Sequence, residues 1–261
     1  MNGALWVAKT GLTAQDASLR TISNNLANVA TVGFKKDRAV FQDLFYQIDR
    51  QPGAQSSQST QLPSGLQLGT GVKTVGTQKL FTNGTLQVTG QSLDVAINGR
   101  GFFQVVSPDG ELNYTRDGQF HLDADGQLVT ANGYILEPSI TIPPDAQTVT
   151  ISEDGIVSVV QIDNSAPSQI GTIQVADFVN PAGLQAQGQN LFVETAASGS
   201  AIVGTPGLTG FGSLKQGALE NSNVNVVEEL VNMISTQRAY EINSKVISTA
   251  DQMLQYVNQN L

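Results

Sequence analysis

SNVNVVEELVNMISTQRAYEINSKVISTADQMLQYVNQNL, residues 222–261, is the stretch that decides the fold predicted for this chain. Asn225 occupies the position of a helix N-cap, and Glu228 follows three residues later, as in a capping box. Neither Gly nor Pro interrupts the residues that follow. The pattern therefore predicts a single helix from Val226 onward, roughly 50 Å long at about 1.5 Å per residue.

Apolar residues of this predicted helix form two stripes. The first repeats at intervals of seven and consists of Val226, Met233, Tyr240, Ile247, Leu254 and Leu261, with Ala250 and Val257 between them. The second, lying about 100° further round the helix, consists of Ile242, Val246 and Met253. Together the stripes cover roughly half the circumference, whereas one partner needs a band of only about 100°. We therefore expect this helix to have more than one neighbour.

A matching helix is predicted over residues 2–30. Its apolar positions also repeat every seven residues, with intervening ones at the three-four spacing: Leu5, Leu12, Leu19 and Leu26, then Ala8, Ile22 and Val29. Only Gln15 breaks the pattern. Two such ends favour an antiparallel coiled coil from which the middle of the chain projects. The alternative, an amphipathic helix packed on a globular domain, remains open.

The apolar faces of the two predicted helices are the candidate assembly surface. The residues that we assign to it are Leu5, Leu12, Leu19, Ile22, Leu26, Val226, Leu230, Met233, Tyr240, Ile247, Leu254 and Val257.

Composition excludes several classes of function. The 261 residues carry a net charge of −9, which opposes binding to nucleic acid and gives an anionic membrane no basic patch to attract. Cysteine is absent, so neither disulfides nor thiol chemistry contribute. No apolar run reaches the ~18–20 residues of a membrane span, and the N-terminal pattern is not that of a secretory signal. We expect no membrane insertion.

Residues 51–65, QPGAQSSQSTQLPSG, contain no charge and almost nothing to bury. Such a composition is typical of a flexible linker or disordered loop. Pro52-Gly53 and Pro63-Ser64-Gly65 nevertheless predict turns, which makes a folded-back tongue possible. The preceding segment, residues 40–46, could be helix or strand.

Residues 72–211 are predicted to be β-structure. Turn dipeptides, the preferred centres of tight hairpins, recur at Asn98-Gly99, Asp109-Gly110, Asp117-Gly118, Asp125-Gly126 and Asn132-Gly133. They indicate a meander of short strands. Later strands are predicted at 148–151, 156–161, 170–178 and 190–193, and the Gly-rich run 204–217 is expected to return the chain to the C-terminal helix.

Groups for catalysis are scarce. His121, the single histidine, is predicted to lie on an exposed strand face, and the Asp residues that precede Gly are explained as turn residues. We predict no catalytic residue, no cofactor and no metal site. Two other classes stay open: a secreted β-rich hydrolase of cell-wall glycan, with a carboxylate pair among those Asp residues, and a monomeric binding module.

The predicted fold class is α+β, with terminal helices paired as an antiparallel coiled coil, a mainly β middle domain and an extended β-like connecting region. Residues 1–33 and 222–261 form the helical core domain, and 76–204 form the outer β domain. Residues 34–75 and 205–221 form the connecting region, which includes the tract 51–71.

Three motifs resemble bacterial flagellar rod and hook proteins. They are SNNLANVATVGFK at 23–35, DVAINGRGFFQV at 94–105 with YTRDG at 114–118, and SNVNVVEELV at 222–231 with QRAYEINSK at 237–245. The similarity spans essentially the whole chain. Within the family, the tract 51–71 and the length point to distal rod members rather than proximal rod or hook members.

The resemblance implies a structural role. Such subunits leave through the flagellar type III export apparatus without a cleaved signal, and they polymerise into a helical filament that carries torque across the periplasm. The partners implied are further copies, the proximal rod proteins, the hook protein, and the P-ring and L-ring proteins. The tract is expected to pack between subunits and make the rod straight and stiff, through Gln51, Pro52, Gly53, Gln55, Gln58, Gln61, Leu62, Pro63 and Gly65.

Overall fold

A computed structural model describes residues 2–53, 55–57, 60–61, 63–162, 166–208 and 210–259. The chain divides into two compact units. The first comprises residues 1–27, 37–78 and 225–261, and the second comprises residues 28–36 and 79–224. Helices at both ends and a mostly β middle confirm the α+β class.

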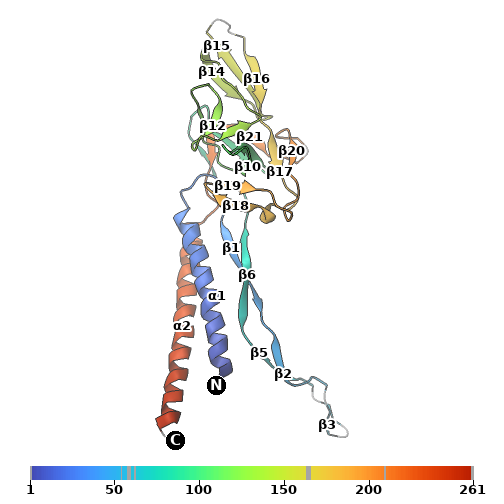
Figure 1. Cartoon of the computed structure of the whole chain (residues 1–261), viewed down its shortest axis with the longest axis vertical. Helices are drawn as coiled ribbons and strands as arrows, with labels where there is room; N and C mark the ends of the chain where they lie inside the picture. Colours follow the sequence, from blue (N-terminus) through green and yellow to red (C-terminus); the bar gives the residue numbers. More distant parts are fainter. Residues whose placement is uncertain are drawn as a thin grey trace. The chain divides into compact units, whose positions relative to one another are not determined.

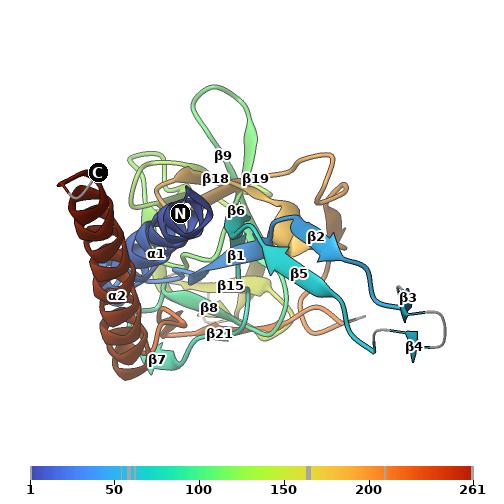
Figure 2. The same ribbon diagram turned by 90° about the horizontal axis from the view of Figure 1, so that it is seen from below.

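The first unit contains the helices α1 (Asn2–Ala27) and α2 (Val226–Gln259), which contact one another and lie side by side in both views (Figures 1 and 2). The predicted start of α2 is confirmed. The Oδ1 atom of Asn225 accepts the backbone N–H groups of Val227 at 3.1 Å and Glu228 at 3.4 Å, as an N-cap does.

Helix α1 ends at Ala27, three residues before the predicted end. The backbone of Thr31 donates to the carbonyl of Asn28 at 3.2 Å, and the hydroxyl of Thr31 donates to the side chain of Asn28. These local bonds compete with helical ones, and the β-branched residues Val29, Thr31 and Val32 favour leaving the helix.

Antiparallel hairpin pairing extends through the rest of the first unit. Strand β1 (Asp37–Asp43) pairs with β6 (Val72–Lys79), β2 (Tyr46–Arg50) with β5 (Leu66–Gly69), and β3 (Gln55–Ser57) with β4 (Thr60–Gln61). The strand pairs β2–β5 and β3–β4 form a folded-back hairpin, which we call the tongue. The folded-back tongue that the sequence made possible is therefore confirmed over the described residues of the tract. The segment that the sequence left unassigned, residues 40–46, contains the end of β1, the connecting residues Leu44 and Phe45, and the first residue of β2.

The second unit is built on a main sheet with the strand order β11-β12-β13-β9-β10-β19-β18, in which β17 also pairs with β9 and β20 with β17. Its strands are β9 (Phe102–Val106), β10 (Leu112–Thr115), β11 (Phe120–Leu122), β12 (Leu128–Thr130), β13 (Ile135–Glu137), β17 (Val175–Asp177), β18 (Gln185–Gly188), β19 (Leu191–Val193) and β20 (Ile202–Gly204).

Smaller antiparallel sheets complete this unit. Strands β14 (Ala146–Ile151), β15 (Ile156–Gln161) and β16 (Ser168–Thr172) form one of them. Strand β7 (Leu86–Val88) pairs with β22 (Ala218–Glu220), and β8 (Val95–Asn98) pairs with β21 (Ser213–Gln216). A 3₁₀ turn, η1 (Pro181–Gly183), precedes β18.

Two apolar clusters cover opposite faces of β9. Phe103 and Val105 belong to the larger cluster, with residues of β8, β13, β15 and β17, while Phe102 packs with Tyr114, Phe178 and Phe192 in the smaller one. The alternation of side chains along a strand explains this division.

Most predicted turns are confirmed, because Gly99, Gly110, Gly126 and Gly133 all have positive φ. Gly118 is the exception. A Cβ on Gly118 would collide with the carbonyl oxygen of Val95, so this glycine permits close backbone approach instead.

One strand prediction was wrong. The single strand expected at 170–178 is divided between β16 and β17, which belong to different sheets. The return segment 204–217 contains β21, whose Ser213 to Gln216 pair with Asn98 to Val95, in agreement with the β-like character expected of the connecting region.

Candidate assembly surface

The predicted apolar face of α1 is largely covered within the first unit. Ile22 is buried and Leu5, Leu12, Leu19 and Leu26 are half-buried. On α2, Met233, Ile247 and Leu254 are half-buried, and Val257 lies where side chains are outside the description. A Cβ built on Gly11 would lie 3.1 Å from the Asn243 amide nitrogen, so α1 and α2 approach closely there.

Helix α2 carries far more apolar surface than α1 covers. Val227 is 70 % exposed, Val231 61 % and Ile242 64 %, and these belong to a larger set that also contains Val226, Leu230, Ile234, Tyr240, Val246, Met253 and Tyr256. Three of the predicted assembly residues, Val226, Leu230 and Tyr240, are thus exposed in the single chain. The expectation that this helix has an uncovered second face agrees with these exposures.

A groove of about 360 Å³ lies along this uncovered face, lined by Val231, Ile234, Ser235, Arg238, Ala239 and Ile242. We call this set the α2 groove. Contiguous apolar surface of this kind marks a site of protein–protein contact in soluble proteins.

The tongue is apolar where its paired strands begin. Phe45 is 90 % exposed, and Tyr46, Ile48, Leu66 and Leu68 are also exposed. Hydrophobic strands that present such surface on a narrow ribbon need a partner. Together with Trp6 and Val7 of α1, Leu68 lines a second groove of about 330 Å³.

The predicted tract residues occupy the far end of the tongue. Gln51, Pro52, Gly53 and Pro63 are exposed, and Gln55 pairs with Gln61 between β3 and β4. Gln58 and Leu62 lie outside the described residues. Gly53 has φ +80°, and a Cβ on Gly65 would collide with the Arg50 carbonyl oxygen, so the local backbone favours glycine at both positions.

A buried amide fixes the end of α1. Asn25 donates to the backbone carbonyl of Asp37 at 2.8 Å and accepts the N–H of the same residue at 2.8 Å. Its amide also donates to the buried carboxylate of Glu229 at 3.4 Å. One side chain thereby joins α1, β1 and the first turn of α2. The sequence motif contained Asn25 but did not reveal this role.

A buried ionic network holds together distant segments of the second unit. Glu220 accepts Lys35 Nζ at 2.6 Å and Arg116 Nη1 at 3.2 Å, and its Oε1 atom also accepts the Gly84 N–H at 2.8 Å. All three charged side chains are essentially inaccessible. We refer to Lys35, Arg116 and Glu220 as the ionic triad.

The triad contains two cations and one anion. Burial lowers the pKa of Lys35, and the nearby Arg116 cation lowers it further, while Glu220 opposes both effects. Burial likewise lowers the pKa of Arg116, against the attraction of Glu220. The backbone carbonyl of Gly99 accepts Arg116 Nη2 at 2.7 Å. The network binds the residues after α1 to those before α2.

Catalytic chemistry finds no support in the described part of the chain. His121 is exposed, as predicted. Among the described residues no group of three or more His, Cys, Asp or Glu side chains could hold a metal ion. No helix within the described ranges is long and apolar enough to cross a membrane.

Comparison with known proteins identifies the family. Family models match residues 5–35 (flagella basal body rod protein), 96–159 (flagellar hook protein FlgE/F/G D1 domain) and 215–260 (flagellar basal body rod FlgEFG protein C-terminal). The chain is 59 % identical to the flagellar basal-body rod protein FlgG of Buchnera aphidicola subsp. Schizaphis graminum, over 98 % of both chains. The chain belongs to the flagellar basal-body rod proteins.

Similarity extends across distant bacteria. The chain is 50 % identical to the FlgG rod protein of Borreliella burgdorferi, over 99 % of this chain and 98 % of that one. The chain is 38 % identical to the FlgG protein of Bacillus subtilis, over 97 % of this chain and 96 % of that one. The predictions of a distal rod protein and of a structural rather than catalytic role are confirmed. Its place is the flagellar basal body, in assembly with other rod and hook components.

Proposed function

We propose that this chain polymerises helically through its terminal helices into the straight, stiff drive shaft of the distal rod. In this arrangement α1 and α2 pair as an antiparallel coiled coil and form the inner layer, and the second unit faces outward. The domain boundaries, 1–33 with 222–261, 34–75 with 205–221, and 76–204, stay part of this proposal.

The observation that carries the proposal is the uncovered apolar face of α2. The helix contacts α1, and the labels N and C stand at the same end of the pair in Figure 1, which supports opposite chain directions. Yet Val231, Ile242 and the rest of the α2 groove stay accessible. Head-to-tail contacts between copies would cover this face, and such contacts give a filament when their rotation does not close.

The tongue would pack between neighbouring copies and limit bending. Its exposed Phe45, Ile48 and Leu68 provide the apolar contact, and its tip carries the uncharged tract residues, including Pro52 and Pro63. A paired hairpin resists bending better than a disordered linker of the same composition does.

The specific partners are further copies of this chain along the filament, proximal rod proteins at one end, the hook protein at the other, and the P-ring and L-ring proteins around it. Delivery would use the flagellar type III export apparatus, and the shaft would span the periplasm to the outer membrane.

Substituting Ile242→Asp tests the assembly proposal. Ile242 is 64 % exposed, so a charge there leaves the single chain folded but would be buried between copies. We expect straight tubes from the concentrated parent chain in electron microscopy, and at least a tenfold higher concentration threshold for the variant. The matched control is Ile162→Asp, which adds the same charge at an apolar residue of the second unit that is 74 % exposed. Normal tubes from Ile242→Asp would contradict the proposal.

Removing residues 51–64 tests the tongue. We expect the shortened chain to assemble into tubes that bend, because the contacts that the tip of the tongue makes with neighbouring copies are missing. A Gly/Ser replacement of equal length is the control that separates chain length from the paired structure. Tubes as straight as those of the parent chain would show that the tongue is only a linker.

A further inference from the structure

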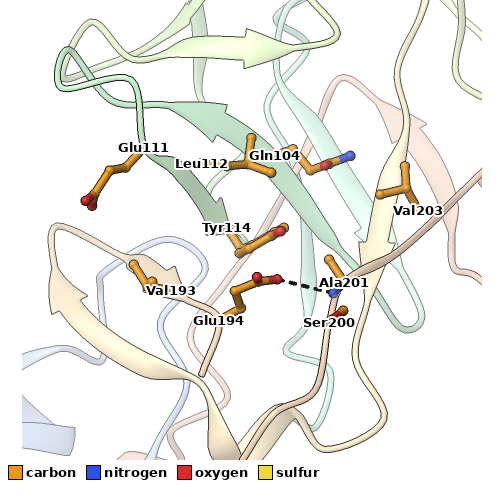
Figure 3. Close-up of a pocket in the computed structure, with 9 residues that line it drawn as sticks. All are labelled: Gln104, Glu111, Leu112, Tyr114, Val193, Glu194, Ser200, Ala201 and Val203. Atoms are coloured by element: carbon orange, nitrogen blue, oxygen red, sulfur yellow. Dashed lines mark hydrogen bonds between the residues drawn. The ribbon is translucent and has the colours of Figure 1, made fainter. Parts of the chain in front are cut away.

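A cavity of about 510 Å³ opens on the second unit between β10, β19 and β20 (Figure 3). It is lined by aliphatic side chains, Leu112, Val193, Ala201 and Val203, and by polar ones, Gln104, Glu111, Tyr114, Glu194 and Ser200. Neither the ionic triad nor the helices contribute to it. We call it the Gln104 cavity.

Gln104 is the first unusual feature of the cavity. It lies on β9 directly opposite Tyr114 of β10, on the same face as the buried Phe102, where alternation predicts an apolar side chain. Gln104 is only 4 % exposed. Within the described residues its side-chain amide has no protein hydrogen-bond partner, and the amide opens onto the cavity rather than being sealed from solvent.

Tyr114 is the second such feature. Its ring packs edge-on against Phe178 at 4.8 Å between centroids, and the residue is 2 % exposed. Its hydroxyl has no protein hydrogen-bond partner in the described part of the chain and opens onto the cavity. Burial raises the pKa of the phenol, and the Glu194 carboxylate raises it further, so the hydroxyl keeps its proton at neutral pH.

Glu194 supplies the charge. One of its oxygens accepts the backbone N–H of Ala201 at 3.3 Å, which leaves the other free to accept a further donor. Figure 3 places Glu111 across the cavity, with its carboxylate directed away from Glu194. The cavity thus brings together a carboxylate, aliphatic walls and two largely buried side chains whose polar groups face it without a protein partner.

We propose that the Gln104 cavity receives one arginine side chain presented by a partner protein that packs against the second unit. The aliphatic walls would contact the methylene stem, as long basic side chains bury their stems against apolar surface. The guanidinium group would donate to Glu194 and to the carbonyl oxygen of Gln104.

Arginine fits this set of acceptors better than lysine. The acceptors come from different strands, and a planar guanidinium with five donors can reach two of them at once, whereas an ammonium is a point charge.

The test is an NMR titration of the full chain, at a concentration where it stays single, with Nα-acetyl-L-arginine N-methylamide. We expect saturable shifts at the amides of Gln104, Tyr114 and Glu194. The citrulline analogue, which has the same shape without the charge, should bind at least several-fold more weakly. Equal binding by citrulline or by spermidine, or the absence of saturable shifts, would overturn the proposal.

Two variants separate binding from folding. Glu194→Gln should weaken binding about tenfold, as expected for loss of a charge-assisted hydrogen bond. The control Glu153→Gln, at an exposed acid outside the cavity, should bind as the parent does. Gln104→Leu should weaken binding while the melting temperature is unchanged or higher. A lower melting temperature with unchanged binding would make Gln104 a structural residue and refute its role. None of these results depends on filament formation.

Discussion

The ionic triad predicts a strong asymmetry between two substitutions. Glu220→Gln keeps the shape of the side chain but removes the anion of the triad, which leaves Lys35 and Arg116 as buried cations without the carboxylate that pairs both of them. Lys35→Met removes the surplus cation instead and leaves a neutral pair of Arg116 and Glu220. Glu220→Gln should therefore destabilise the second unit far more than Lys35→Met does.

The magnitudes follow from the geometry. Losing one partner of a buried charge pair costs about 3–5 kcal/mol, since the remaining charge is uncompensated. Lys35→Met loses the bonds from Nζ to Glu220 and to the Thr82 carbonyl at 2.9 Å, but it also removes the cost of burying an ammonium group. We expect a loss of about 1 kcal/mol or less for this variant. The difference should exceed about 2 kcal/mol.

Thermal unfolding of the full chain, followed by near-ultraviolet circular dichroism, measures this difference. For a unit of this size, 3–5 kcal/mol corresponds to a fall of roughly 6–20 °C in the melting temperature. Equal destabilisation by the two variants, or a loss below about 1 kcal/mol for Glu220→Gln, would refute the reasoning.

The pH dependence provides a second readout of the triad. The folded chain holds the pKa of Lys35 below its usual value of 10.5, so in the window between the folded and unfolded pKa the unfolded chain binds more protons. The stability of the parent chain therefore rises with pH through that window. Lys35→Met should lack this contribution, so the difference in unfolding free energy between this variant and the parent should change with pH just below 10.5. A constant difference would contradict the assignment.

Two further predictions concern other buried polar groups. Asn25→Ala should cost about 2–3 kcal/mol in chemical unfolding followed at 222 nm, because it removes the two bonds from Asn25 to the Asp37 backbone and the bond to the Glu229 carboxylate. Ser23→Ala, on the exposed side of α1, should be neutral, and a neutral Asn25→Ala would refute this role. Burial raises the pKa of Asp117, and Asp94 adds to the effect, so the folded chain binds more protons than the unfolded chain and stability falls as pH rises above 3.8. Asp117→Asn, which can still accept the Gln119 N–H, should remove that fall and be more stable than the parent at pH 7 in thermal unfolding. A less stable variant would contradict the assignment.

Local chemistry explains which parts of the fold could be predicted from the sequence. The start of α2 depends on Asn225 and on the residues immediately after it, so its position was predicted correctly. Hairpin turns such as Asp125-Gly126 are equally local. The end of α1 was misplaced because a continuing apolar repeat at Val29 suggested helix, while the bonds between Thr31 and Asn28 favour a turn.

Features that depend on distant partners could not be predicted. Nothing in residues 170–178 shows that β16 pairs with β15 while β17 pairs with β9, and the change of sheet between them divides the predicted strand. The ionic triad joins residues separated by 185 and 104 positions, and each member alone is an ordinary charged residue in the sequence. Gly118 resembles a turn glycine, and only the approach of Val95 reveals its function.

Polar motif residues and apolar assembly residues differ in how strictly geometry constrains them. Asn25 must present a donor and an acceptor to one residue, Gly33 must adopt φ +70° beside the Arg116 backbone, and Lys35 must reach a buried carboxylate. Other side chains cannot meet these demands, which is why these positions form a recognisable motif. The exposed face of α2 needs only apolar residues of suitable size, because volume-conserving apolar exchanges usually cost less than about 1.5 kcal/mol. The assembly surface is therefore visible as a periodicity, whereas the groups that fix the subunit's own fold are visible as a motif.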